Sequence, residues 1–154
     1  RYLNLLETSH MLTRLPAYLV NRTKRLIKSP KIYWTDTGLA MYLSGAERPT
    51  GAHLENLLHH DLAAWRDARV HRAEVFYWRT TTGDEVDFVV EANSRLLPIE
   101  VKSTTQPRLK DAVHLRTFRS EYGETSRNGL LLHDGDQVEW LTQGILAAPW
   151  WRVF

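Results

Sequence analysis

Charged side chains interrupt two apolar stretches of the sequence, and their types and spacing could do chemistry. Asp87 lies within the run 85–92, and Glu100 and Lys102 lie within the run 95–103. Because side chains alternate along a strand, Glu100 and Lys102 should project from the same face. Burying one unpaired charge costs several kcal/mol, so we expect these charges to neutralise one another or to hold a cation.

A divalent cation is the natural occupant of such a group. If the two runs form neighbouring strands, Asp87 joins Glu100 and Lys102 near one end of the sheet. Glu55 lies at the margin of the apolar face of a helix predicted over 53–69, so its carboxylate can approach the same place. Oxygen ligands favour Mg²⁺ or Mn²⁺, and the chain has no cysteine for a thiolate zinc site. The alternative is a purely structural ion pair between Glu100 and Lys102.

The elements that must position these residues are those of an α/β body. Three consecutive segments are rich in aromatic and β-branched residues and are separated by turn sequences, which predicts strands. Further helices and strands follow from apolar periodicity and from Pro107 and Gly123 at the ends of a helix. The predicted helices cover 53–69 and 106–123, and the predicted strands cover 74–80, 85–92, 95–103, 128–134 and 135–142, before an aromatic tail over 148–154.

Several other titratable residues lie near these elements without forming a site of their own. His59, His60 and Asp61 are consecutive and would point in three directions on a helix, so they cannot chelate one ion. We expect them and His53 to be surface residues. Glu85 begins a strand, and solvation is the default expectation for its charge.

The first 48 residues predict a separate segment. A short amphipathic helix over 2–12 is followed by extended stretches over 12–21 and 31–39, an arrangement that resembles the second half of a winged-helix module. A short helix over 37–43 then leads into a loop rich in Gly and Pro. We therefore place a boundary there, with a winged-helix-like segment over 1–48 and the α/β body over 49–154.

Basic residues concentrate in this amino-terminal segment. The chain up to Thr35 has seven Lys and Arg residues against a single acidic residue, whereas the remainder is net acidic. Clustered basic side chains release counterions from phosphates, which predicts contact with DNA, with RNA as the open alternative. A solvated face or a contact with a neighbouring domain explains the cluster equally well. The candidate nucleic-acid contacts are Arg14, Arg22, Lys24, Arg25 and Lys28.

The order of the acidic residues and the lysine resembles the PD-(D/E)XK signature of restriction-endonuclease-like nucleases. Glu55 on a helix, Asp87 on a strand and Glu100-Val101-Lys102 on the next strand follow that pattern, although Val86 stands where proline is usual. The resemblance implies that Asp87 and Glu100 bind magnesium. It also implies that Lys102 positions the attacking water and offsets negative charge. Glu55 would assist.

A second resemblance covers almost the whole chain. The stretches SPKIYWTDTGLAMYLSG, GAHLENLLHHDL, VFYWRTTTGDEVDFVV and LLPIEVKS are similar, in order and spacing, to the carboxy-terminal domain of unknown function of prokaryotic AAA-type ATPases. This implies an upstream ATPase module in the same polypeptide and a restriction-endonuclease-like mixed sheet flanked by helices. The 154 residues contain no phosphate-binding loop of the Gly-x-x-x-x-Gly-Lys-Ser/Thr type, so ATP chemistry would belong to that upstream module.

Three functions follow as expectations. The first is magnesium-dependent cleavage of DNA, and the second is a catalytically silent module that brings an ATPase to nucleic acid or to a protein. The third is an ion-paired scaffold without a polyanion ligand. No apolar run approaches the roughly 20 residues of a membrane span, and the absence of cysteine fits the cytoplasm. The oligomeric state is left open.

Overall fold

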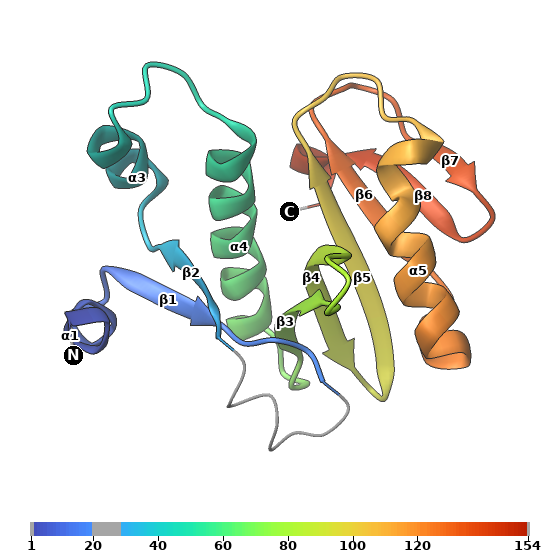
Figure 1. Ribbon diagram of the computed structural model, residues 1–154, viewed down its shortest axis with the longest axis horizontal. Helices are drawn as coiled ribbons and strands as arrows, with labels where there is room; N and C mark the ends of the chain where they lie inside the picture. The colour runs from blue at the N-terminus through green and yellow to red at the C-terminus, as the bar shows by residue number, and fades with distance from the viewer. Residues whose placement is uncertain (1, 20–28, 154) are drawn as a thin grey trace.

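The computed structural model describes residues 2–19 and 29–153, and its elements follow the predicted order (Figure 1). The helices are α1 (Tyr2–Thr8), α3 (Thr37–Ser44), α4 (Gly51–Asp67) and α5 (Val113–Tyr122), with short 3-10 turns at Leu109–Ala112, Gly123–Thr125 and Trp150–Arg152. The strands are β1 (Leu12–Leu15), β2 (Lys31–Trp34), β3 (Glu74–Arg79), β4 (Glu85–Ala92), β5 (Arg95–Lys102), β6 (Gly129–His133), β7 (Glu139–Thr142) and β8 (Ile145–Pro149).

The body of the molecule is a six-stranded mixed sheet with the order β3-β4-β5-β6-β8-β7. The first three strands form an antiparallel meander, whereas β6 pairs parallel with both β5 and β8. Strand β7 closes the far edge as the antiparallel partner of β8. The prediction of an α/β body with a central mixed sheet is therefore confirmed.

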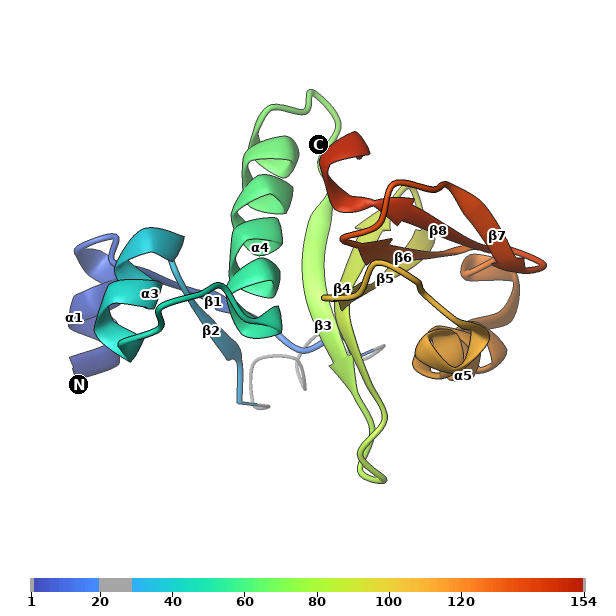
Figure 2. The same ribbon diagram turned by 90° about the horizontal axis from the view of Figure 1, so that it is seen from above.

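Helices cover both faces of this sheet, and each face has its own core. Figure 2 shows α4 on one side of the sheet and α5 on the other. Leu58 of α4 and Phe88 of β4 are fully buried in the first core, and Phe118 of α5 and Leu131 of β6 are fully buried in the second. Burial on both faces explains why β4, β5 and β6 are nearly continuous apolar runs, in which any charge is conspicuous.

The amino-terminal strand pair β1–β2 is tied to the body at two places. Asn56 of α4 is buried, accepts the N–H of Trp34 through Oδ1 (2.8 Å) and donates through Nδ2 to the Trp34 carbonyl (3.0 Å). Beyond β1, the N–H of Tyr18 donates to the Tyr77 carbonyl and the N–H of Tyr77 to the Pro16 carbonyl, so this stretch runs along the edge strand β3. These contacts place β2 beside α4, close to Glu55.

Three features of the fold differ from the sequence-based expectations. Strand β8 was not predicted, and only its last two residues fall within the predicted aromatic tail over 148–154. Its Ile-Leu-Ala-Ala run has weak β propensity and is stabilised by parallel pairing with β6. The helix α1 forms, but none of its residues is buried. His53 and His59 are buried, so their expected surface positions were wrong. No helix within the described ranges has the length and apolarity of a membrane span.

Candidate functional site

Asp87 lies where strands β4 and β5 part. The β4–β5 pairing runs from the turn as far as Phe88 opposite Ile99 and ends there, and the β3–β4 register shifts at the same level. At this point Asp87 Oδ2 accepts the backbone N–H of Val101 at 2.9 Å. The side chain thus continues the connection between the strands after the backbone ladder has stopped, which fixes the carboxylate beside β5.

A lysine from the amino-terminal segment meets the carboxylates of α4 and β4. Lys31 Nζ lies 2.8 Å from Glu55 Oε1, 2.5 Å from Glu85 Oε1 and 3.4 Å from Asp87 Oδ1. Burial alone would lower the pKa of Lys31, but Glu55 and Asp87 raise it overall, so the side chain is an ammonium. Glu85 also pairs with Arg79 at 2.9 Å, so its charge is not simply solvated.

Tyr33, two residues further along β2, completes this group from the same face of the strand. Its hydroxyl donates to Glu55 Oε1 at 2.5 Å, and its ring stacks on His59 with centroids 4.2 Å apart. Burial, reinforced by Glu55, raises the pKa of Tyr33, so the hydroxyl keeps its proton and stays a donor. Burial and nearby Arg66 lower the pKa of His59 to about 4, which leaves a neutral ring suited to stacking.

Glu100 and Lys102 form a second group on β5. Glu100 is 3% exposed, and its Oε1 lies 2.8 Å from Lys102 Nζ. Its Oε2 is buried without a hydrogen-bond partner among the described residues. Glu100 is in register with Leu131 of the second core, so it faces the α5 side, whereas Lys31 approaches from the α4 side.

Asp87 connects the two groups electrostatically. Burial raises the pKa of Glu100 to about 8, and the charge of Asp87 contributes to that rise. Burial also raises the pKa of Asp87, with Glu55 as the next cause. Burial works against the charge of Lys102, but its ion pair with Glu100 raises its pKa. The four residues singled out from sequence therefore act on one another through Asp87.

The oxygen donors at this place suit a hard divalent cation in part. The unpartnered Glu100 Oε2 is a buried acceptor of the kind that a bound ion would satisfy. On the α4 side, however, the carboxylate oxygens converge on the ammonium of Lys31. Over residues 2–19 and 29–153, no three His, Cys, Asp or Glu side chains are already arranged to hold a metal ion. Asp87 and Glu100 are the residues that would hold one.

Sequence reasoning missed Lys31 and Tyr33, because the inward direction of their side chains is visible only in the structure. Both face inward from β2, while the apolar Ile32 between them is 45% exposed. This reversal of the usual pattern, with a charge inside and an isoleucine outside, indicates that an inward-facing lysine has a partner.

Arg14 is the one predicted nucleic-acid contact that lies within the described residues. Arg22, Lys24, Arg25 and Lys28 lie outside the described residues. Arg14 is described, and its guanidinium lies 3.0 Å from a Glu7 carboxylate oxygen and donates to Asn4 Oδ1 at 2.7 Å. These contacts leave Arg14 partly neutralised, and its role in nucleic-acid binding stays a prediction.

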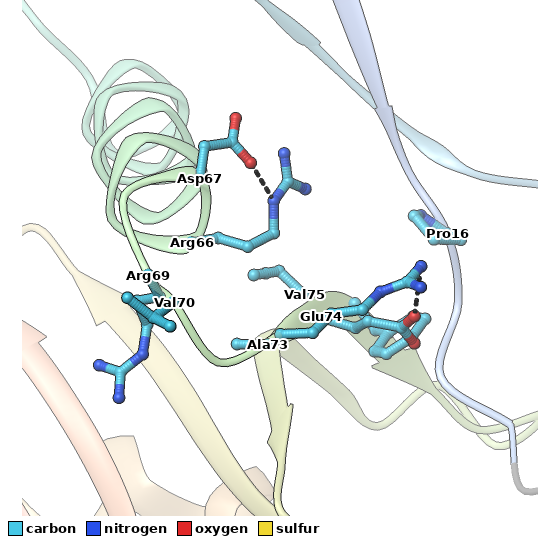
Figure 3. Close-up of a pocket in the computed structure, with 10 residues that line it drawn as sticks. Pro16, Arg66, Asp67, Arg69, Val70, Ala73, Glu74 and Val75 are labelled. Carbon is cyan, nitrogen blue, oxygen red and sulfur yellow. Dashed lines mark hydrogen bonds and ion pairs between the residues drawn. The ribbon is translucent and has the colours of Figure 1, made fainter.

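A cavity of about 520 Å³ lies at the far end of α4, away from these groups (Figure 3). Two of its three arginines are already paired, Arg66 with Asp67 at 2.8 Å and Arg72 with Glu74 at 3.2 Å, and the third, Arg69, lies over the Trp65 ring. Eleven residues of helix, about 16 Å at 1.5 Å per residue, separate Arg66 from Glu55. This cavity is therefore a separate feature from the candidate site.

The pKa of Glu100 predicts that stability depends on pH in the metal-free chain. Because this pKa is raised from 4.5 to about 8, the folded chain keeps a proton that the unfolded chain releases. The stability that this proton contributes is fully present below the pKa of Glu100 in the unfolded chain, and it is lost as the pH rises through the pKa of Glu100 in the folded chain. In EDTA we expect the urea midpoint to fall between about pH 5 and pH 8.5, and Glu100→Gln to flatten this decline.

The matched control is Glu139→Gln on the exposed edge strand β7, which should leave the pH dependence unchanged. An equally steep decline in Glu100→Gln would show that another group titrates.

Two family models match the chain. Residues 50–153 match the family model described as Domain of unknown function (DUF4143), and residues 1–50 match another, Domain of unknown function (DUF8612). The chain is 29% identical over 158 aligned positions to Uncharacterized protein Rv2008c of Mycobacterium tuberculosis and to Uncharacterized protein Mb2031c of Mycobacterium bovis.

In each case the alignment covers 97% of this chain and 34% of the relative, so the chain spans about a third of the length of the curated relatives that it matches. No solved structure gives a significant match. Since the first model covers most of the molecule, including α4, the six-stranded sheet and α5, the chain belongs to the DUF4143 family.

Proposed function

We propose that the chain is a magnesium-dependent DNA nuclease domain of the PD-(D/E)XK type. The observation that carries this proposal is the buried Glu100, whose Oε2 lacks a partner among the described residues while its Oε1 holds Lys102. The Val101 N–H holds Asp87 against β5, the strand that carries Glu100. A buried acid with a free oxygen next to a second acid and an ammonium is the arrangement that this chemistry requires.

The order of elements supports the same fold type. A helix carrying Glu55 precedes a three-stranded antiparallel meander, whose second strand carries Asp87 and whose third carries Glu100 and Lys102. The third strand then pairs parallel with β6 after the crossover through α5. The mixed sheet with a helix on each face is what the resemblance to restriction-endonuclease-like nucleases implies.

The residues would divide the work of phosphodiester hydrolysis, in which a water oxygen bonds to phosphorus and an ester oxygen leaves with a proton. Asp87 and Glu100 would hold Mg²⁺, which when bound supplies a water of lowered pKa and positive charge near the phosphate. Lys102 is the part that reaches solvent, with 37% of its side chain exposed. Its ammonium, oriented by Glu100, would offset negative charge on the phosphate.

The basic surface beside Lys102 offers a path for the DNA backbone. A cavity of about 360 Å³ at the end of β5 is lined by Lys102, Arg108 and Lys110 together with hydroxyl groups of the following loop. Within the described part of the chain, Arg108 and Lys110 are exposed and form no ion pair. Two exposed cations beside an active-site lysine fit the phosphates that flank a cleaved bond.

We therefore expect Arg108→Gln combined with Lys110→Gln to weaken binding of a labelled DNA duplex in EDTA. Each lost phosphate contact should reduce the slope of log affinity against log salt by about 1, with an affinity loss of about tenfold for the pair at moderate salt. Fluorescence anisotropy across a salt series measures both quantities.

Arg95→Gln, at the opposite end of β5, is the matched control and should bind as the wild type does. An unchanged salt slope in the double variant would exclude this path for the backbone.

A second candidate function is a catalytically silent recognition module that brings an ATPase to nucleic acid or to a protein partner. The observation in its favour is Lys31, whose ammonium already pairs with three of the carboxylates. Incubation of supercoiled plasmid with the chain in Mg²⁺, and in EDTA as the control, separates the two. Nicking only in Mg²⁺ supports the nuclease, whereas binding without nicking supports the recognition module.

The proposed setting is the carboxy-terminal end of a cytoplasmic AAA-type ATPase. The mycobacterial relatives extend well beyond the aligned region, which leaves room for such a module. Since DNA is the proposed substrate, ATP hydrolysis upstream would move or remodel the nucleic acid that this domain contacts.

A further inference from the structure

Lys31 occupies the space between carboxylates that belong to another part of the chain. It comes from β2, whereas its partners Glu55, Glu85 and Asp87 come from α4 and β4. The lysine is 56 residues away from Asp87 in sequence. An ammonium has three N–H donors, and three carboxylates lie within 3.4 Å of Nζ, so its bonding capacity is filled.

These three acids could not lie together without a cation. Their side chains are 23%, 24% and 15% exposed, so solvent screens them only in part. Like charges at such short range repel strongly when they are removed from water. In sites with two divalent ions, carboxylates solve this problem by sharing metal charge. Here the ammonium of Lys31 supplies positive charge between the three carboxylates.

We propose that Lys31 is a tethered cation that takes the place of a second divalent ion, so that the site admits a single ion at Asp87 and Glu100. Asp87 is the residue common to both groups, because it contacts Lys31 through Oδ1 and influences Glu100 on the other side. Among the described residues, the buried carboxylate oxygen without a partner belongs to Glu100, whereas the carboxylate oxygens that face Lys31 already have one.

This inference rests on the divalent-ion site of the proposed function and adds a residue to it. It makes the amino-terminal strand pair part of the site, since Tyr33 of the same strand holds Glu55 in place through its hydroxyl. The charge on one side of Asp87 is then fixed by the protein, and only the other side depends on the metal supplied by the solution.

The test is to count Mn²⁺ ions bound to the chain and to its Lys31→Met variant by equilibrium dialysis. Methionine keeps much of the length of the lysine side chain and removes its charge, so the carboxylates of Glu55 and Asp87 lose their cation, whereas Glu85 keeps its ion pair with Arg79. We expect one ion per chain for the wild type and two for Lys31→Met. Mn²⁺ should also raise the melting temperature of the variant by more than that of the wild type.

Two further variants serve as controls. Arg95→Met removes an exposed cation at the opposite end of β5 and should bind one ion. Lys31→Arg retains the cation, and should also bind one. If Lys31→Met folds under none of the conditions, the wild type itself decides the question, because binding of two ions with Lys31 in place overturns the inference.

Equal Mn²⁺ numbers and affinities for wild type and Lys31→Met would also overturn it. The results that would refute the nuclease proposal differ from those that would overturn the role of Lys31. A wild type that binds one ion and nicks no plasmid in Mg²⁺, with two ions bound to Lys31→Met, refutes cleavage and supports the role of Lys31. A wild type that binds no ion while Lys31→Met binds one likewise refutes metal-dependent cleavage and supports Lys31 as a substitute for an ion.

Discussion

Asp87→Asn, Glu100→Gln and Lys102→Met should each lower the proposed magnesium-dependent nicking of plasmid by about 100-fold or more. The first two remove a carboxylate that would bind the ion, and the third removes the ammonium that would offset negative charge on the phosphate. The side chains keep nearly their original volume, so packing around the buried Glu100 is preserved. Initial rates of conversion of supercoiled to open-circular plasmid measure the effect.

Asp67→Asn provides the matched control, since it makes the same exchange at the exposed far end of α4. It should nick plasmid at the wild-type rate. Circular dichroism of every variant checks that the fold persists. Nicking by Lys102→Met or Glu100→Gln at the wild-type rate would mean that a contaminating nuclease or another site is responsible.

The second large effect concerns the core that supports Asp87. Phe88→Ala should lower the free energy of unfolding by about 3–5 kcal/mol, because it empties a fully buried position and leaves a cavity. Phe88 follows Asp87 directly and packs near Tyr33 and His59, with ring centroids 6.0 and 6.2 Å away. We therefore expect weaker Mn²⁺ binding as well as lower stability. Urea unfolding and equilibrium dialysis measure the two effects.

Phe118→Ala separates stability from site geometry. Phe118 is equally buried but lies in the second core, where it packs edge-on against Trp78 with centroids 5.3 Å apart. Its loss should cost a similar free energy and leave Mn²⁺ affinity nearly unchanged in the folded chain. The milder pair Phe88→Leu and Phe118→Leu repeats the comparison if the alanine variants unfold. Equal metal affinities within the pair would refute a link between the first core and the site.

The central elements were open to prediction from the sequence because their signals are local. Alternation and β-branched residues marked β3, β4 and β5 almost to the residue, and apolar spacing at three and four marked α4. The charges of Asp87, Glu100 and Lys102 stood out for the same reason, since two-sided burial makes neighbouring positions apolar.

Other features depended on partners far away in the chain. Strand β8 has little strand propensity of its own, and parallel pairing with β6 makes it a strand. His59 is polar by type but is buried by the ring of Tyr33, which stacks on it from β2. The local sequence could not reveal the pairing of β8 with β6 or the stacking of Tyr33 on His59, because a local pattern carries no information on which distant residues cover a strand or a helix face.

By itself the sequence determined the order of the helices and of every strand except β8, the apolar character of the central strands, and the identity of an acid-acid-lysine pattern on adjacent strands. Only the tertiary structure decided how those charges are balanced. It places Lys31 among Glu55, Glu85 and Asp87 and leaves one oxygen of Glu100 without a partner among the described residues. The physical reason is that the interaction between charges depends on their distance in space and not on their separation in sequence. Packing of β2 on α4 places Lys31 next to Asp87, although 56 residues of chain separate the two.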